Sequence, residues 1–177
     1  MENQTIEAKA ASITIFKLEA KSLMETALWL SAAVAAPALL AHTPHNQWIT
    51  GTMVNAILFL AAKRLPLANA LTIAVFPSTI ALLRGLLPAP MAMLIPYIII
   101  SNAILIATFS ISKLQLFSRM VAASLAKFAF LFLISYAFAS SQMGIVIQML
   151  GWPQLVTALA GGILAIGALK IFEKRKF

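Results

Sequence analysis

Residues 42–62 read HTPHNQWITGTMVNAILFLAA, and residues 75–102 read VFPSTIALLRGLLPAPMAMLIPYIIISN. Six of the eight prolines and both histidines fall between His42 and Asn102. Within this stretch, apolar runs alternate with short turns that contain proline, glycine or charged residues. Apolar runs interrupted in this way are typical of helices that cross a membrane and return. The stretch therefore predicts an all-α membrane fold, and the rest of the chain continues the same pattern.

Composition extends this prediction to the whole chain. Of the 177 residues, 62% are hydrophobic and 10% are charged, and the mean hydropathy is +0.95. A soluble domain has about a quarter of its residues charged, so the chain belongs to the class of polytopic membrane proteins. It has no cysteine, which excludes disulfides and thiolate metal sites. The net charge of +8 does not indicate a nucleic-acid partner, because excess Lys and Arg in a membrane protein mostly record its orientation.

We expect three segments along the chain. Residues 1–22 form an amphipathic helical lead-in at the cytoplasmic surface of the membrane, residues 23–172 form a domain of six transmembrane helices, and residues 173–177 form a basic cytoplasmic tail. Pro77 removes a backbone hydrogen bond, which predicts a break in the third helix near Phe76. The six predicted spans cover residues 23–41, 51–62, 67–83, 91–110, 120–139 and 154–172.

The connections between these spans carry the orientation signal. Eleven of the thirteen Lys and Arg residues lie at the termini or in the second and fourth connections. The positive-inside rule then places both termini in the cytoplasm, in a multi-pass protein of the cell membrane. The polar loop predicted at residues 42–50 faces outward in this arrangement.

Lys127 and Arg84 are the two basic residues that break this pattern. Lys127 lies in the fifth predicted span, about 12 Å from its inner end at helical rise. A lysine at mid-membrane costs about 2.5–3.5 kcal/mol. One interpretation is that a bound anion neutralises Lys127, and the other is that it snorkels inward or pairs with Glu25. Arg84, at the outer end of the third span, can grip a carboxylate or phosphate, or it can serve as an interfacial anchor.

Two amides are candidates for the same binding region. Asn102 lies about 18 Å below Pro90 at helical rise, a depth close to that of Lys127, so the two side chains are predicted to line one cavity. Asn55 lies one turn below Gly51, nearer the outer surface. An amide within a membrane usually faces a partner or a cavity, so a structural hydrogen bond between helices is the alternative for each.

The predicted outer loop holds the remaining candidates. His45, Asn46 and Trp48 are expected to contact a solute as part of a lid. His42 and His45 are a weak metal signal, because two imidazoles without a nearby carboxylate do not complete a site. Tryptophan at a membrane interface is common and also needs no ligand.

No catalytic signature accompanies these residues. The chain contains no HExxH, GxSxG or phosphate-binding glycine loop. The spans hold no pair of carboxylates for acid–base chemistry, and the spacing of the serines and histidines does not suggest a catalytic dyad. We therefore expect a protein that is not an enzyme and that carries neither a cofactor nor a metal.

The whole layout is similar to that of one family. The similarity covers about residues 23–172 and rests on four short motifs, which are Ala32-x-x-x-Ala36, Gly51-Thr-Met-Val-Asn55, the proline-broken span ending Arg84-Gly85, and Pro96-Tyr-Ile-Ile-Ile-Ser-Asn102. In these features the chain resembles the small substrate-binding (S) components of the energy-coupling factor (ECF) transporters of prokaryotes.

The resemblance implies an importer subunit that captures a vitamin or similar micronutrient, here a small polar or anionic solute, beneath the outer loop. Its partners would be a membrane coupling subunit, contacted through Ala32 and Ala36, and two cytoplasmic ATPases. Small residues at that spacing also serve ordinary intramolecular packing. Family members specific for cobalt or nickel use an N-terminal histidine, and Met1-Glu2-Asn3 here does not match that class. Two alternatives are an accessory subunit that organises a membrane enzyme complex and an intramembrane enzyme that uses the histidines.

Overall fold

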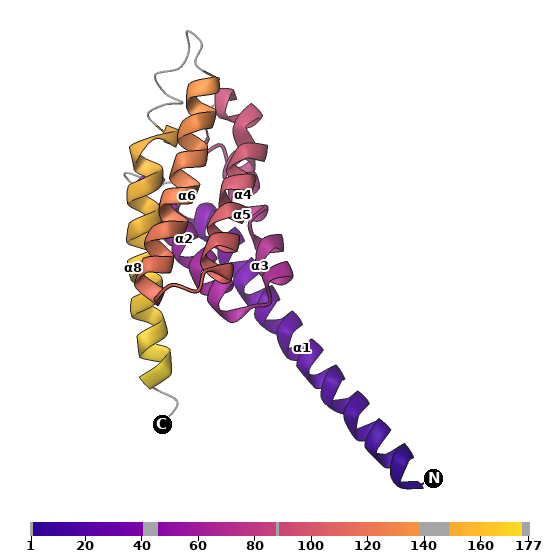
Figure 1. The fold of residues 1–177 in the computed structure, drawn as a ribbon. Helices are drawn as coiled ribbons and strands as arrows, with labels where there is room; N and C mark the ends of the chain where they lie inside the picture. Colours follow the sequence, from indigo (N-terminus) through magenta and orange to yellow (C-terminus); the bar gives the residue numbers. More distant parts are fainter. Residues whose placement is uncertain (1, 41–45, 88, 139–148, 175–177) are drawn as a thin grey trace.

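A computed structural model describes residues 2–40, 46–87, 89–138 and 149–174, and side chains within 19–40, 47–87, 91–138 and 149–172. Most of these residues are helical, and none of them is in a strand. Figure 1 shows the helices gathered into one bundle, from which the N-terminal part of the first helix extends. The elements are α1 (Glu2–Leu39), α2 (Asn46–Arg64), α3 (Leu67–Ile73), α4 (Phe76–Leu83), η1 (Ala89–Leu94), α5 (Ile95–Ile111), α6 (Leu116–Ala137) and α8 (Trp152–Lys174).

Four helices in the described part of the chain are long and apolar enough to cross a membrane. Their apolar stretches are Glu19–Leu40, Met91–Ile111, Leu116–Ala137 and Trp152–Phe172, and a shorter apolar segment covers Leu67–Leu83. Large apolar side chains are exposed on several of these helices, as contact with lipid requires. They include Leu28, Phe132, Leu133, Ile163 and Leu164. The predicted all-α class is therefore confirmed for the described residues, and four of the six predicted spans coincide with helices that could cross a membrane.

The third predicted span is divided into α3 and α4. The two helices are separated at Ala74 and Val75, and Pro77 lies in the first turn of α4. Proline has no amide hydrogen and its ring crowds the carbonyl four residues earlier, so one continuous helix is disfavoured here. The predicted break near Phe76 is confirmed. It leaves the carbonyl of Ala74 available to a side chain from another helix.

The second helix begins earlier than predicted. We expected residues 42–50 to be a loop, but α2 starts at Asn46 and includes Trp48 and Thr50. Gly51 is therefore inside the helix, although an interior glycine costs about 0.5–1 kcal/mol relative to alanine. A Cβ atom at Gly51 would lie 3.1 Å from the methyl carbon of Thr157. Gly51 therefore allows α8 to pack closely against α2, and it does not mark the start of α2.

The backbones of α2 and α8 approach each other closely at Gly161. A Cβ atom there would lie 2.6 Å from the carbonyl oxygen of Thr52 and 2.7 Å from the amide nitrogen of Ala56. Small residues permit such contacts between membrane helices, where dispersion and hydrogen bonding replace the hydrophobic effect. Beside this contact the core contains Phe59 and Phe109, whose rings meet edge to face with centroids 5.1 Å apart. The α2–α8 pair therefore fixes one side of the bundle.

The alanine stripe of α1 lies against the chain's own helices. Ala36 is only 9% exposed and Ala32 packs against the main core. Farther toward the N-terminus, the Asn69 amide of α3 donates to the hydroxyl oxygens of Ser22 and Thr26 at 3.1 and 3.0 Å. The structure thus favours the packing alternative for the two alanines. Contact of Ala36 with a coupling subunit would require part of this core to open.

Candidate solute site

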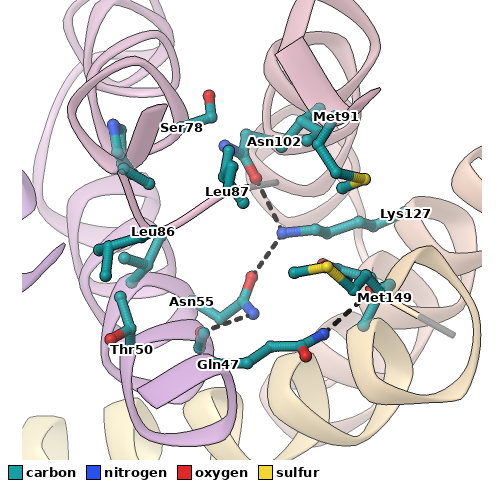
Figure 2. Close-up of a pocket in the computed structure, with 16 residues that line it drawn as sticks. Gln47, Thr50, Asn55, Ser78, Leu86, Leu87, Met91, Asn102, Lys127 and Met149 are labelled. Carbon is teal, nitrogen blue, oxygen red and sulfur yellow. Dashed lines mark hydrogen bonds between the residues drawn. The ribbon is translucent and has the colours of Figure 1, made fainter. Parts of the chain in front are cut away.

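Lys127 lies near the midpoint of α6, about 16 Å from either end at helical rise. Its side chain is 3% exposed. The ammonium group donates to Asn55 Oδ1 at 2.7 Å and to Asn102 Oδ1 at 2.8 Å. Figure 2 shows Lys127 reaching between these two amides, which come from α2 and α5. Three helices therefore converge on one buried positive charge.

Each amide is oriented by the hydrogen bonds of its own NH2 group. Asn55 Nδ2 donates to the Gly51 carbonyl at 2.8 Å and to the Thr157 hydroxyl at 3.4 Å. Asn102 Nδ2 donates at 3.2 Å to the carbonyl of Ala74, which lies at the break between α3 and α4. Because the nitrogens are engaged on the far side, both amide oxygens face the ammonium group. The network thus links α2, α5, α6 and α8 to the proline-induced break.

A cavity of about 120 Å³ adjoins this network, and Asn55, Asn102 and Lys127 all line it. Much of its remaining wall is apolar. The apolar residues include Val54, Leu86, Leu87, Met91 and Ile98. Ligand sites of this kind combine an apolar wall with a few polar groups that fix the orientation of the ligand. The cavity therefore has the composition of a small-molecule site.

Part of the wall is positioned by the end of α4. Gly85 has φ +69°, and the amide of Leu86 donates to the carbonyl of Ala81 at 2.9 Å. This hydrogen bond and the left-handed glycine are the marks of a Schellman ending, which turns the chain sharply after a helix. The turn brings Leu86 and Leu87 to the cavity. It also explains the Arg84-Gly85 pair as a helix ending.

Two glutamines line the cavity, one in the first turn of α2 and one in the first turn of α8. Gln47 and Gln154 each donate through Nε2 to the carbonyl of Met149, at 3.3 and 3.2 Å. All three residues belong to the lining. A primary amide has two N–H donors and an accepting oxygen, so each glutamine retains hydrogen-bonding capacity after this contact. The glutamines therefore add neutral polar groups to the wall.

Two lining residues have buried hydroxyl oxygens without a hydrogen-bond partner among the described residues. They are Thr50 on α2 and Ser78 on α4. A buried polar group left without a partner costs about 1–3 kcal/mol, and native structures contain few of them. Both oxygens are enclosed by protein atoms, so the two residues line the cavity through their other atoms.

The charge of Lys127 has no acidic counterpart in this site. None of the described lining residues is Asp or Glu. The chain has no Asp, and its five acidic residues are Glu2, Glu7, Glu19, Glu25 and Glu173. The two groups that accept from Lys127 in the described structure are neutral amides. Neither snorkelling nor pairing with Glu25 therefore describes the position of this side chain.

Of the seven solute-contact residues predicted from the sequence, the structure brings three together and leaves two apart, and it does not describe the side chains of the other two. Asn55, Asn102 and Lys127 line the same cavity. Arg84 is exposed at the end of α4, and Trp48 is 42% exposed; neither is part of the lining. His45 lies outside the described residues, and Asn46 is described only as the first residue of α2.

Helical spacing in the sequence could have identified several residues at or near the site that we did not predict. Gln154, Thr157 and Gly161 recur at intervals of three and four, which places them on one face of α8. Gln47 and Thr50 lie within about two turns of Asn55, which was selected, on α2. The assignment of residues 42–50 to a loop concealed this second spacing.

The described residues include no group of three His, Cys, Asp or Glu that could hold a metal ion. No family, no curated protein and no solved structure matches the chain. The geometry around Lys127 is therefore the basis for a functional proposal.

Proposed function

We propose that this chain is a membrane protein that binds a small polar solute in the cavity beside Lys127. The observation that carries the proposal is the buried ammonium group, which is held at mid-helix by two neutral amide oxygens. An ionisable group placed this way within a membrane helix is expensive and is normally tied to function. Binding of a solute acceptor would lower that cost.

Lys127 has the hydrogen-bonding capacity for this role. A lysine ammonium group has three N–H donors, and two of them are directed to Asn55 and Asn102. No further protein acceptor is described for the third. The two amides hold the nitrogen in place, so a solute would meet a donor that is already oriented. Preorganisation of this kind lowers the entropy cost of binding.

We further propose that the chain acts as an S component of an ECF-type importer in the cell membrane. Six helical segments, counting α3 and α4 as one, would fit that layout if each crosses the membrane, and the positive-inside rule would place both termini in the cytoplasm. In Figure 1 the N-terminal end of α1 and the C-terminal end of α8 lie toward the same end of the molecule, which suits an even number of crossings. The partners would be a coupling subunit and two ATPases.

Native mass spectrometry of gently purified protein tests the binding proposal. We expect a retained small molecule on the wild-type chain and on Lys170→Met, and its loss from Lys127→Met. Lys170 is the matched control because it undergoes the same substitution at an exposed position on α8. Equal retention by Lys127→Met would contradict the proposal, provided that circular dichroism shows the variant to be folded.

Co-purification tests the importer role separately. A tagged chain expressed in its native host should bring down one membrane protein and two ATPases. Recovery of a membrane enzyme complex instead would favour the role of accessory subunit. Leucine substitution of Ala36 is unsuitable for this test, because overpacking of a buried position would disturb the fold itself.

A further inference from the structure

We propose that the ligand of this cavity is a singly charged carboxylate carried on a compact apolar group. This inference rests on the proposed solute-binding function and specifies its chemical class. Three features of the cavity carry it, namely the balance of charge, the volume and the chemistry of the wall.

The balance of charge sets the charge of the ligand. Lys127 is the one Lys or Arg among the described lining residues, and that lining contains no acid. A bound anion with one negative charge would leave the site neutral, whereas a dianion would leave a net negative charge buried in the membrane. An unpaired charge in a medium of low dielectric constant is strongly unfavourable. The site is therefore suited to a monoanion.

The volume sets the size of the buried part of the ligand. The cavity measures about 120 Å³. An engineered protein cavity of about 150 Å³ accommodates benzene, which has six non-hydrogen atoms. The enclosed part of the ligand is then of comparable size, which corresponds to a carboxylate with a body of about three or four carbon atoms.

The wall distinguishes a carboxylate from an inorganic anion. Val54, Leu87, Met91 and Ile98 would contact the ligand away from the ammonium group, and an ion such as phosphate has no apolar part to bury there. One carboxylate oxygen would accept the third donor of Lys127.

A thermal-shift titration with three matched small molecules tests this assignment. Butyrate is a monocarboxylate with a short apolar chain, butyramide is its uncharged counterpart, and succinate has the same chain length with two carboxylates. Each is added to the purified wild-type chain at constant ionic strength. We expect butyrate, about tenfold above its Kd, to raise Tm by about 3–6 °C, while the other two leave Tm unchanged.

The outcomes separate the ligand class from the proposed function. An equal rise with butyramide would overturn the requirement for charge, and an equal rise with succinate would overturn the single charge. If butyrate has no effect but native mass spectrometry recovers a solute whose retention depends on Lys127, the carboxylate assignment is wrong and solute binding stands. If butyrate has no effect and no solute is recovered, both are wrong. Since the panel uses the wild-type chain, the test does not depend on the folding of a variant.

Discussion

At the scale of single residues, Asn55 and Asn102 make the buried position of Lys127 tolerable. Each amide accepts from the ammonium group through oxygen and donates through nitrogen to the backbone of another turn or helix. Hydrogen bonds that involve a charged group contribute about 1.5–3 kcal/mol, roughly twice the contribution of neutral ones. The two amides therefore act as ligands for the ammonium group and as links between helices.

Replacement of Asn55 by leucine should destabilise the protein, because Lys127 would lose one of its two acceptors. We expect a loss of about 2–3 kcal/mol, measured as a lowered Tm of the purified protein. In the background of Lys127→Met the same substitution should cost clearly less, because no charge then lacks a partner. Equal losses in the two backgrounds would show that the hydrogen bond between Asn55 and Lys127 contributes little.

The similar depth of Asn102 and Lys127 was predictable, whereas the contact of Asn55 with Lys127 was not. Helical rise is constant, so counting from the span ends gave Asn102 and Lys127 similar depths. The depth of a residue in the membrane does not show which helices are neighbours in the bundle. The sequence therefore left Glu25 as a candidate partner of Lys127. Arg84 was selected for its position outside the charge pattern, but the Schellman ending at Gly85 leaves it exposed and away from the cavity lining.

At the scale of helices, the close contact of α2 with α8 sets the geometry of the site. Gly161 lies against the α2 backbone between Thr52 and Ala56, adjacent to Asn55. The sequence has a glycine pair, Gly161-Gly162, in the last span, but it does not indicate which helix the pair would contact. The early start of α2 was also missed. The polar residues of its first turn have the composition of a loop, and they were therefore assigned to one.

Gly161→Ala should separate α2 from α8 and weaken the site. The added Cβ would lie 2.8 Å from Cβ of Asn55 and closer still to two backbone atoms. We expect a loss of about 1–3 kcal/mol, with Tm lowered by about 2–4 °C for each kcal/mol. Gly167→Ala in the same helix is the control, because nothing lies within 4 Å of its added Cβ. Similar Tm values for the two variants would mean that α2 and α8 pack less closely than described.

At the scale of the whole molecule, the account requires an even number of membrane crossings with both termini in the cytoplasm. Four helices in the described part of the chain have the length and hydropathy for crossing, whereas α2 and the α3–α4 pair do not reach both measures. If both also cross, residues at the start of α2 and at the end of α5 lie on opposite sides of the membrane. The absence of cysteine makes this arrangement directly measurable.

Single cysteines at Trp48 and Leu114 should react from opposite sides. Both side chains are exposed, at 42% and 56% respectively. In intact cells, a maleimide that cannot cross the membrane should label Trp48→Cys, and Leu114→Cys should react only after permeabilisation. Labelling of both from one side would contradict the six-span arrangement, and the reverse pattern would contradict the proposed orientation.

Asn102→Asp is the sharpest test of whether a bound anion neutralises Lys127. Aspartate has nearly the size of asparagine and would place a carboxylate beside the ammonium group, where Asn102 Oδ1 now lies at 2.8 Å. The affinity of this variant for the solute recovered from the wild type, or for butyrate, is measured by isothermal titration calorimetry. The account predicts an affinity at least tenfold lower, about 1.4 kcal/mol, in a variant that remains folded. An unchanged affinity would contradict it.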